Sequence, residues 1–193
     1  MIKEVAIPEG TEVRKEDNNI VVKGPKGELI RTLKHSKIKI NVKGNLVSLK
    51  SEDDRRRSKG ILGTFAAHVQ NMVNGVTHGY EARLKVVYSH FPVRIKAENN
   101  EFVVENFVGE KKPRIAKILP DTEVKIEKDD VIVTGVDKEK VGITASRIER
   151  IAKVTGFDRR VFSDGIYITE KPKAIGGQDT VATETTNPEE NKE

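Results

Sequence analysis

The stretch that decides the fold is Lys37-Ile38-Lys39-Ile40-Asn41-Val42-Lys43, followed by Gly44-Asn45 and then by Leu46-Val47-Ser48-Leu49. Apolar and polar residues alternate strictly in its first part, and this alternation predicts a β-strand with one apolar and one basic face. Gly44-Asn45 is typical of a tight turn. The stretch therefore predicts a β-hairpin that buries one face.

The same hairpin pattern returns in the second half of the chain at one constant offset. Residues 124–129 read Val-Lys-Ile-Glu-Lys-Asp and align with residues 40–45, and residues 131–133 read Val-Ile-Val and align with residues 47–49. A helical pattern follows each hairpin. Strands, helix and helix stop recur in the same order, which predicts two copies of one unit.

The first helix is expected around residues 58–73, where apolar residues recur at helical spacing. Candidate caps are Ser51, Asp53 and Asp54, and Asn74-Gly75 is the expected end. Arg55-Arg56-Arg57 stands near the helix start, where the macrodipole disfavours cations. Either the helix begins later or an anion neutralises these arginines.

The second helix is expected from Asp137 to Val154, with Gly156 ending it. Shorter alternating segments before each hairpin predict further strands. Gly24-Pro25-Lys26-Gly27 could clamp a nucleic-acid backbone, but its place between two strands favours a β-turn.

These patterns predict an α+β protein made of two tandem copies of one small domain, in which a main helix backs small sheets. We expect the first domain at residues 1–80 and the second at 81–172. Residues 173–193 have almost no core-forming side chains and more acidic than basic ones, so we expect a disordered acidic tail.

The composition indicates a soluble, basic protein of a reducing compartment. The 193 residues include no Cys, 36% are hydrophobic and 34% are charged, and the formal net charge is +5. The sequence starts without a signal-type apolar segment and has no run that could span a membrane, so we expect a cytoplasmic protein. A cationic surface without an amphipathic membrane segment favours nucleic acid as the partner.

A basic segment near the end of the second copy is the first candidate for that contact. Arg159 and Arg160 could each bind phosphate oxygens, and Ser163 and Asp164 could hold the backbone of their own loop. Gly165 is expected to allow a tight turn through a positive φ. A solvated hairpin is the alternative to a polyanion contact.

Cations on the second helix favour the polyanion contact, because Arg and Lys outnumber Glu on its last turns. The cations along the whole of this predicted helix are Lys138, Lys140, Arg147, Arg150 and Lys153. If this surface does not bind the polyanion, the alternative contact surface is Lys111, Lys112 and Arg114.

Motifs of catalysis and metal binding are missing. The sequence has no nucleophile elbow, phosphate-binding Gly-Lys-Ser/Thr loop or serine triad spacing, so we expect neither an enzyme nor a cofactor. His68 lies beside the apolar stripe of the first helix, and packing or hydrogen bonding is the expected role because no other His has metal-ligand spacing with it.

Five motifs, in family order, resemble large-subunit ribosomal protein six in its archaeal and eukaryotic form. They read Val-Lys-Gly-Pro-Lys-Gly at 22–27, His-Val-Gln-Asn-Met-Val-Asn-Gly-Val-Thr at 68–77, Val-Tyr-Ser-His-Phe-Pro at 87–92, Asn-Phe-Val-Gly-Glu-Lys at 106–111, and the basic segment 159–171. The likeness covers about residues 1–172. Phe157 stands where the family motif usually has a basic residue.

The resemblance implies a fold in which each half packs two small sheets and one helix around a single core. It also implies binding to large-subunit rRNA, mainly through the second domain, near the sarcin-ricin loop and the stalk base where translation factors dock, with other large-subunit proteins as neighbours. A free-standing RNA- or protein-binding adaptor is the alternative. The expected rRNA-binding residues are Lys111, Lys112, Lys138, Lys140, Arg147, Arg150, Lys153, Arg159, Arg160, Ser163, Asp164, Gly165, Tyr167 and Lys171.

Overall fold

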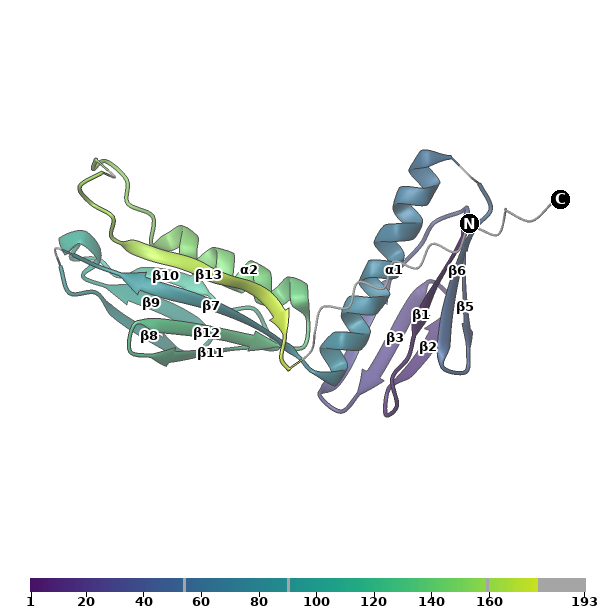
Figure 1. The fold of residues 1–193 in the computed structure, drawn as a ribbon. Helices are drawn as coiled ribbons and strands as arrows, with labels where there is room; N and C mark the ends of the chain where they lie inside the picture. Colours follow the sequence, from purple (N-terminus) through teal and green to yellow (C-terminus); the bar gives the residue numbers. More distant parts are fainter. Residues whose placement is uncertain (54, 90, 159, 177–193) are drawn as a thin grey trace.

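The computed structural model describes residues 1–176 except 54, 90 and 159. Two lobes follow one another along the chain, and they meet where the first helix ends and the second lobe's first strand begins (Figure 1). Residues 177–193, which make up most of the expected acidic tail, lie outside the described residues.

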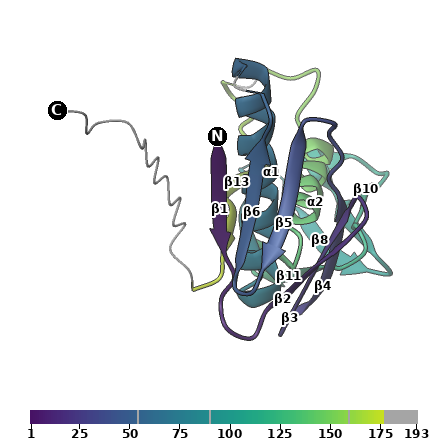
Figure 2. The same ribbon diagram turned by 90° about the vertical axis from the view of Figure 1, so that its right-hand side faces the viewer.

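The first lobe has two three-stranded antiparallel sheets and one helix. One sheet has the order β1-β6-β5 and the other β2-β3-β4. Figure 2 shows α1 running alongside β1, β6 and β5. The elements are β1 (Ile2–Ala6), β2 (Glu12–Glu16), β3 (Asn19–Gly24), β4 (Gly27–Thr32), β5 (Ile38–Lys43), β6 (Leu46–Ser51) and α1 (Arg56–Thr77).

The hairpin expected from the repeated stretch is β5–β6, with Ile40 paired to Leu49 and Lys43 to Leu46. Its apolar face closes a core with α1, because Leu49 and Leu62 are fully buried. The 24–27 segment forms the expected turn between β3 and β4, and Gly24 pairs with Gly27 across it.

The second lobe repeats this plan and adds one strand. Its sheets have the orders β11-β12-β7-β13 and β10-β9-β8. The elements are β7 (Tyr80–Val87), β8 (Arg94–Glu98), β9 (Glu101–Glu105), the 3-10 turn η1 (Phe107–Gly109), β10 (Arg114–Lys117), β11 (Thr122–Glu127), β12 (Asp130–Gly135), α2 (Lys138–Ile151) and β13 (Gly165–Ala174). The α+β class and the duplication are therefore confirmed.

The second lobe extends past both of its expected limits. Tyr80 starts β7 and is 1% exposed in the second core. Lys173 and Ala174, which the composition places in the tail, belong to β13, because they pair with Glu81 and Tyr80. The polar composition of this segment does not predict the pairing, because a strand that adds to an existing sheet needs few core residues of its own.

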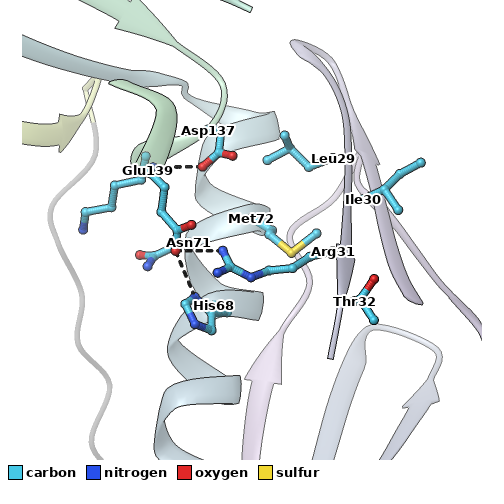
Figure 3. Close-up of a pocket in the computed structure, with 10 residues that line it drawn as sticks. Leu29, Ile30, Arg31, Thr32, His68, Asn71, Met72, Asp137 and Glu139 are labelled. Carbon is cyan, nitrogen blue, oxygen red and sulfur yellow. Dashed lines mark hydrogen bonds and ion pairs between the residues drawn. The ribbon is translucent and has the colours of Figure 1, made fainter. Parts of the chain in front are cut away.

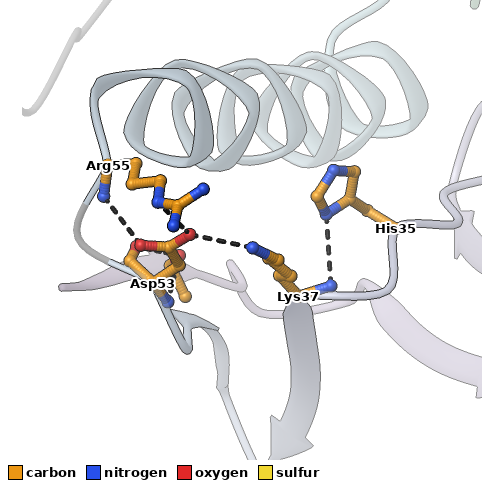
Figure 4. A network of polar contacts seen from close by, with 5 residues as sticks. His35, Lys37, Asp53 and Arg55 are labelled. Carbon is orange, nitrogen blue, oxygen red and sulfur yellow. Dashed lines mark hydrogen bonds and ion pairs between the residues drawn. The ribbon is translucent and has the colours of Figure 1, made fainter.

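The start of α1 answers the question raised by its arginines. The helix begins at Arg56, within the basic run, so a later start is wrong. Arg55 is the N-cap without a side-chain capping bond, and Asp53 acts just before it by accepting the Arg55 N–H at 3.1 Å. The Asp53 carboxylate also pairs with Lys37 at 2.9 Å and with the Arg55 guanidinium at 3.4 Å (Figure 4). The bond from Lys37 is the main reason why the pKa of Asp53 lies below its usual value.

The end of α1 differs from the expectation. The helix continues through Asn74 and Gly75 to Thr77, and Gly79, with φ of +76°, follows its C-cap. Gly75 is needed for another reason: a Cβ there would lie 2.1 Å from the carbonyl oxygen of Val136 in the second lobe. The glycine thus lets the helix approach the backbone that leads into α2.

The helix α2 spans Lys138–Ile151 and is shorter than expected. Asp137 caps it by accepting the Glu139 N–H at 2.9 Å. Its C-cap is Ala152, four residues before Gly156, so Gly156 does not end the helix.

Polar contacts accompany the backbone approach at the junction of the lobes. The Tyr80 hydroxyl donates to the Asn71 carbonyl at 3.1 Å, and Arg31 pairs with Glu139 at 2.8 Å. His68 Nδ1 lies 3.6 Å from the same Glu139 carboxylate, beside a cavity of about 310 Å³ (Figure 3). His68 is thus partly buried at the junction of the lobes.

Candidate nucleic-acid interface

Gly165 does not form a tight turn, so that expectation is wrong. It is the first residue of β13, pairs with Val87 and lacks a positive φ. A Cβ at this position would lie 3.0 Å from the ring of Tyr167. The glycine makes room for this ring, whose hydroxyl donates to the Ser163 carbonyl at 3.1 Å.

The described hydrogen bond of Asp164 reaches a different loop from its own, and the residue is too buried to touch RNA. It is 1% exposed, and its Oδ1 accepts the Ser89 N–H at 2.6 Å. A buried carboxylate bonded to a backbone N–H fixes two segments that are distant in sequence. Asp164 therefore joins the loop before β13 to the loop after β7.

Asp158 has the role that was expected of Asp164. Its Oδ1 accepts the Arg160 N–H at 2.9 Å, and its carbonyl accepts the N–H groups of Val161 at 3.1 Å and Phe162 at 2.9 Å. An Asp side chain often accepts a hydrogen bond from the backbone N–H two residues later and so stabilises a turn. The position of Asp158 two residues before Arg160 could therefore have predicted this role.

Arg114 fixes a third loop to these two. Its guanidinium donates to the carbonyls of Ile151 at 2.7 Å and Lys153 at 2.9 Å, just after α2. It also pairs with Glu110 and lies 4.4 Å from the ring centre of Phe107. Arg114 is thus committed to internal contacts and is a poor phosphate ligand.

These contacts bring three loops to one end of the second lobe. We call this end the tip and define it as residues 88–93, 106–113 and 152–164. The loops lie where β7, β9 and α2 end and where β13 begins, at the left of the second lobe in Figure 1. Residues 90 and 159 of these loops are outside the described part of the chain.

The expected cations divide into two groups. Four of them are exposed at the tip and have no ion pair with any described residue: Lys111, Lys112, Lys153 and Arg160. Arg147 and Arg150 are exposed on the later turns of α2, and the Arg147 guanidinium donates to the Lys117 carbonyl at 3.3 Å.

The second group lies away from the tip, toward the junction. Lys140 pairs with Asp121 at 2.6 Å, and Lys138 lies 5.4 Å from the ring centre of Tyr80. Lys171 belongs to β13 between Glu170 and Lys173, which pair with Arg83 and Glu81 of early β7. The structure therefore does not bring these three cations together with those of the tip. Arg159 lies outside the described residues.

Among the residues that the structure describes, no helix is long and apolar enough to cross a membrane, and no group of three or more His, Cys, Asp and Glu side chains could hold a metal ion.

The fold and its exposed cations define a class of duplicated, basic α+β proteins, and comparison with known proteins makes this specific. The sequence matches the profile of the family described as "Ribosomal protein L6" over residues 7–79 and again over residues 91–165. The first match falls in the first lobe and the second match in the second lobe.

Similar proteins carry the name "Large ribosomal subunit protein uL6". The one from Methanosarcina mazei is 45% identical over 175 residues, which is 89% of this chain and 99% of that protein. The one from Methanothrix thermoacetophila is 42% identical over 171 residues, with 89% and 97% covered. The one from Ignicoccus hospitalis is 47% identical over 169 residues, with 85% and 91% covered.

This chain belongs to the ribosomal protein L6 family. The resemblance seen in the five motifs is therefore confirmed, and so is its archaeal type, since the relatives named above are archaeal. A ribosomal-protein family is a family of structural proteins, which confirms that the chain is not an enzyme.

Proposed function

We propose that this protein is a structural constituent of the large ribosomal subunit and binds large-subunit rRNA through the tip of its second lobe. The observation that carries the proposal is the set of four exposed cations without ion pairs among the described residues, all on loops fixed at one end of the fold. Membership in the ribosomal protein L6 family supports it.

The rigidity of the tip is the physical basis of the binding. Flexible basic segments lose conformational entropy when they bind, whereas loops that are already fixed lose less. Asp164 and Arg114 fix the tip loops by hydrogen bonds to backbone groups of other segments. These two residues, with Gly165, are positioning residues in this proposal, while Lys and Arg side chains contact phosphates.

The wider interface includes the cations along α2. Arg147 and Arg150 extend the basic surface from the tip. Arg159, which the sequence predicts to bind RNA, lies outside the described residues. Ser163 is exposed beside these cations and its hydroxyl can donate a hydrogen bond to RNA. The exposed Tyr167 hydroxyl already donates to the Ser163 carbonyl, so toward RNA it can only accept. Lys138, Lys140 and Lys171 lie farther away and would contact a second RNA segment.

The resemblance to large-subunit ribosomal protein six supports a position near the sarcin-ricin loop and the stalk base. In that position the partners are large-subunit rRNA and neighbouring large-subunit proteins, with translation factors docking nearby. The protein would then work in the cytoplasm as part of the ribosome.

A salt series of binding to a large-subunit rRNA fragment tests the tip. Replacing Lys111, Lys112, Lys153 and Arg160 by Ala should weaken binding and flatten the slope of log K against log salt by about 0.7 to 0.9 per lost phosphate contact. The matched control replaces the exposed first-lobe residues Lys23, Lys43 and Lys50 by Ala and should keep the wild-type slope. An unaltered slope in the tip variant would place the contact elsewhere.

Co-sedimentation with large subunits separates a ribosomal constituent from a free-standing adaptor. We expect the protein to stay with the subunits through a high-salt wash. An adaptor would be released, because it lacks the buried RNA contacts of an assembled subunit.

A further inference from the structure

Exposed aromatic side chains gather at the tip, and the cation contacts do not account for them. Within the described ranges the exposed aromatics are Tyr88 at 45%, Phe91 at 40%, Phe157 at 51% and Tyr167 at 38% exposure. The first three belong to the tip loops, and Tyr167 bonds to Ser163 at their border. Five further aromatic residues lie in the two cores or against them.

The protein supports these rings from behind. The Phe157 ring centre lies 4.9 Å from that of Phe162, which packs on the second core. Phe91 packs against Gly109, where an added Cβ would lie 3.4 Å from its ring. Tyr167 is held by its hydroxyl bond to the Ser163 carbonyl at 3.1 Å. The rings of Phe91, Phe157 and Tyr167 are therefore held in place while part of each stays open to solvent.

Exposed, supported aromatic rings among unpaired cations are suited to bases whose faces are accessible. In a continuous RNA duplex the base faces are stacked on one another, so aromatic side chains gain nothing from them. In loops, bulges and ends, single bases can stack on Phe and Tyr rings while Lys and Arg bind the adjacent phosphates.

We propose that Tyr88, Phe91 and Phe157 form a stacking platform for unpaired bases, so that the RNA element bound at the tip is a loop or bulge. This inference rests on the proposed rRNA binding and specifies the kind of RNA. The charge of the surroundings selects RNA over an apolar protein partner. Lys153 and Arg160 lie in the same loop as Phe157, Lys111 and Lys112 lie in another loop of the tip, and none of the four has a described acidic partner.

Two RNA probes test the inference with the full-length protein. One is a stem with an unpaired loop from large-subunit rRNA, and the other is a continuous duplex with the same number of phosphates. The variants Tyr88→Leu, Phe91→Leu and Phe157→Leu keep an apolar side chain but remove the ring. Each should bind the loop probe roughly 5- to 150-fold more weakly for every stacked base that is lost, and bind the duplex unchanged.

A base-stacking readout and a matched control sharpen the test. The fluorescence of 2-aminopurine placed in the loop should be quenched on binding the wild type and less quenched with the Leu variants. Ile30→Ala removes an exposed apolar side chain from the first lobe and should bind both probes like the wild type. Thermal unfolding of each variant confirms that the fold is kept.

Three results would overturn the inference. In the first, the Leu variants bind the loop probe like the wild type although the tip cation variant does not, which leaves the proposed function intact. In the second, the Leu variants lose affinity equally for loop and duplex, which indicates a purely structural role. In the third, they bind naked RNA normally but no longer co-sediment with large subunits, which assigns the rings to a neighbouring protein. If the cation variant also binds RNA normally, the proposed function itself fails.

Discussion

The two lobes share one strand order but finish in different ways. In the first lobe, α1 leads through Gly79 directly into β7 of the second lobe. In the second lobe, α2 is followed by residues 152–164 and then by β13, which pairs with β7. The strand of the first lobe that corresponds to β7 is β1. In the described part of the chain β1 is an edge strand, with no strand paired to it in the position that β13 has beside β7.

This difference explains where the tip comes from. The chain has to cross from the end of α2 to the far side of β7, and the crossing segment carries Lys153, Phe157 and Arg160. The first lobe uses the end of its helix to join the second lobe instead. One duplicated unit thus provides a junction at the end of one helix and an exposed loop at the end of the other.

Removal of β13 should cause the largest difference in stability between the two lobes. A chain that stops after Asp164 lacks Ile166, which is 1% exposed, and leaves the edge of β7 uncovered. Because a single Ile→Ala change in a core costs about 2–5 kcal/mol, loss of the whole strand should unfold the second lobe and leave the first lobe folded. Amide-proton dispersion would show native signals from residues 1–79 only.

The reciprocal fragment tests whether the second lobe is a separate folding unit. We propose that residues 81–173 fold alone, and adding Tyr80 and Ala174 to this fragment should stabilise it, because these two residues pair with each other. If the chain that stops after Asp164 still showed native amide-proton dispersion for residues 80–152, β13 would not be needed to fold the second lobe.

A substitution at Gly75 should have the next largest effect on stability, because Gly75 lies at the junction of the lobes. In Gly75→Ala the new Cβ would lie 2.1 Å from the Val136 carbonyl oxygen, and overpacking of this kind costs about 1–3 kcal/mol. Gly60→Ala in the same helix is the matched control. A Cβ at Gly60 meets nothing within 4 Å, so this change should stabilise by up to about 1 kcal/mol.

Urea unfolding of the two glycine variants gives the comparison directly. Opposite signs of the change in unfolding free energy are expected. Equal stability of both variants would mean that the lobes do not approach one another closely in solution.

A pH series at the junction should show the smallest effect. Burial is the main reason why the pKa of His68 lies below its usual value, and the Arg31 charge adds to the shift. The unfolded chain therefore binds a proton near pH 6.5, where the folded chain does not yet do so. Stability should be unaffected above this pH and should fall as the pH drops from about 6.5 through the lowered pKa.

The variant His68→Gln should remove this part of the pH dependence. Unfolding free energies of wild type and variant at pH 7.5 and 5.5 would measure it, and the wild type should lose more stability on acidification. Parallel losses in both proteins would show that His68 is not desolvated by the junction.

Local sequence patterns determined a large part of this protein. The repeated hairpin, the apolar stripes of both helices and the turn at Pro25-Lys26 follow from the periodicity and backbone preferences of neighbouring residues. The five motifs identified the family, and the basic segment before β13 was found from its composition.

Only the tertiary structure decided the roles that depend on distant residues. The local sequence predicts a helix stop at Gly75 and a turn at Gly165, because it does not show that Val136 or the Tyr167 ring comes close. Asp164 and Arg114 bond to backbone groups that local patterns do not connect to them. Secondary structure depends mostly on neighbours along the chain, whereas the tip exists only because three distant loops pack together.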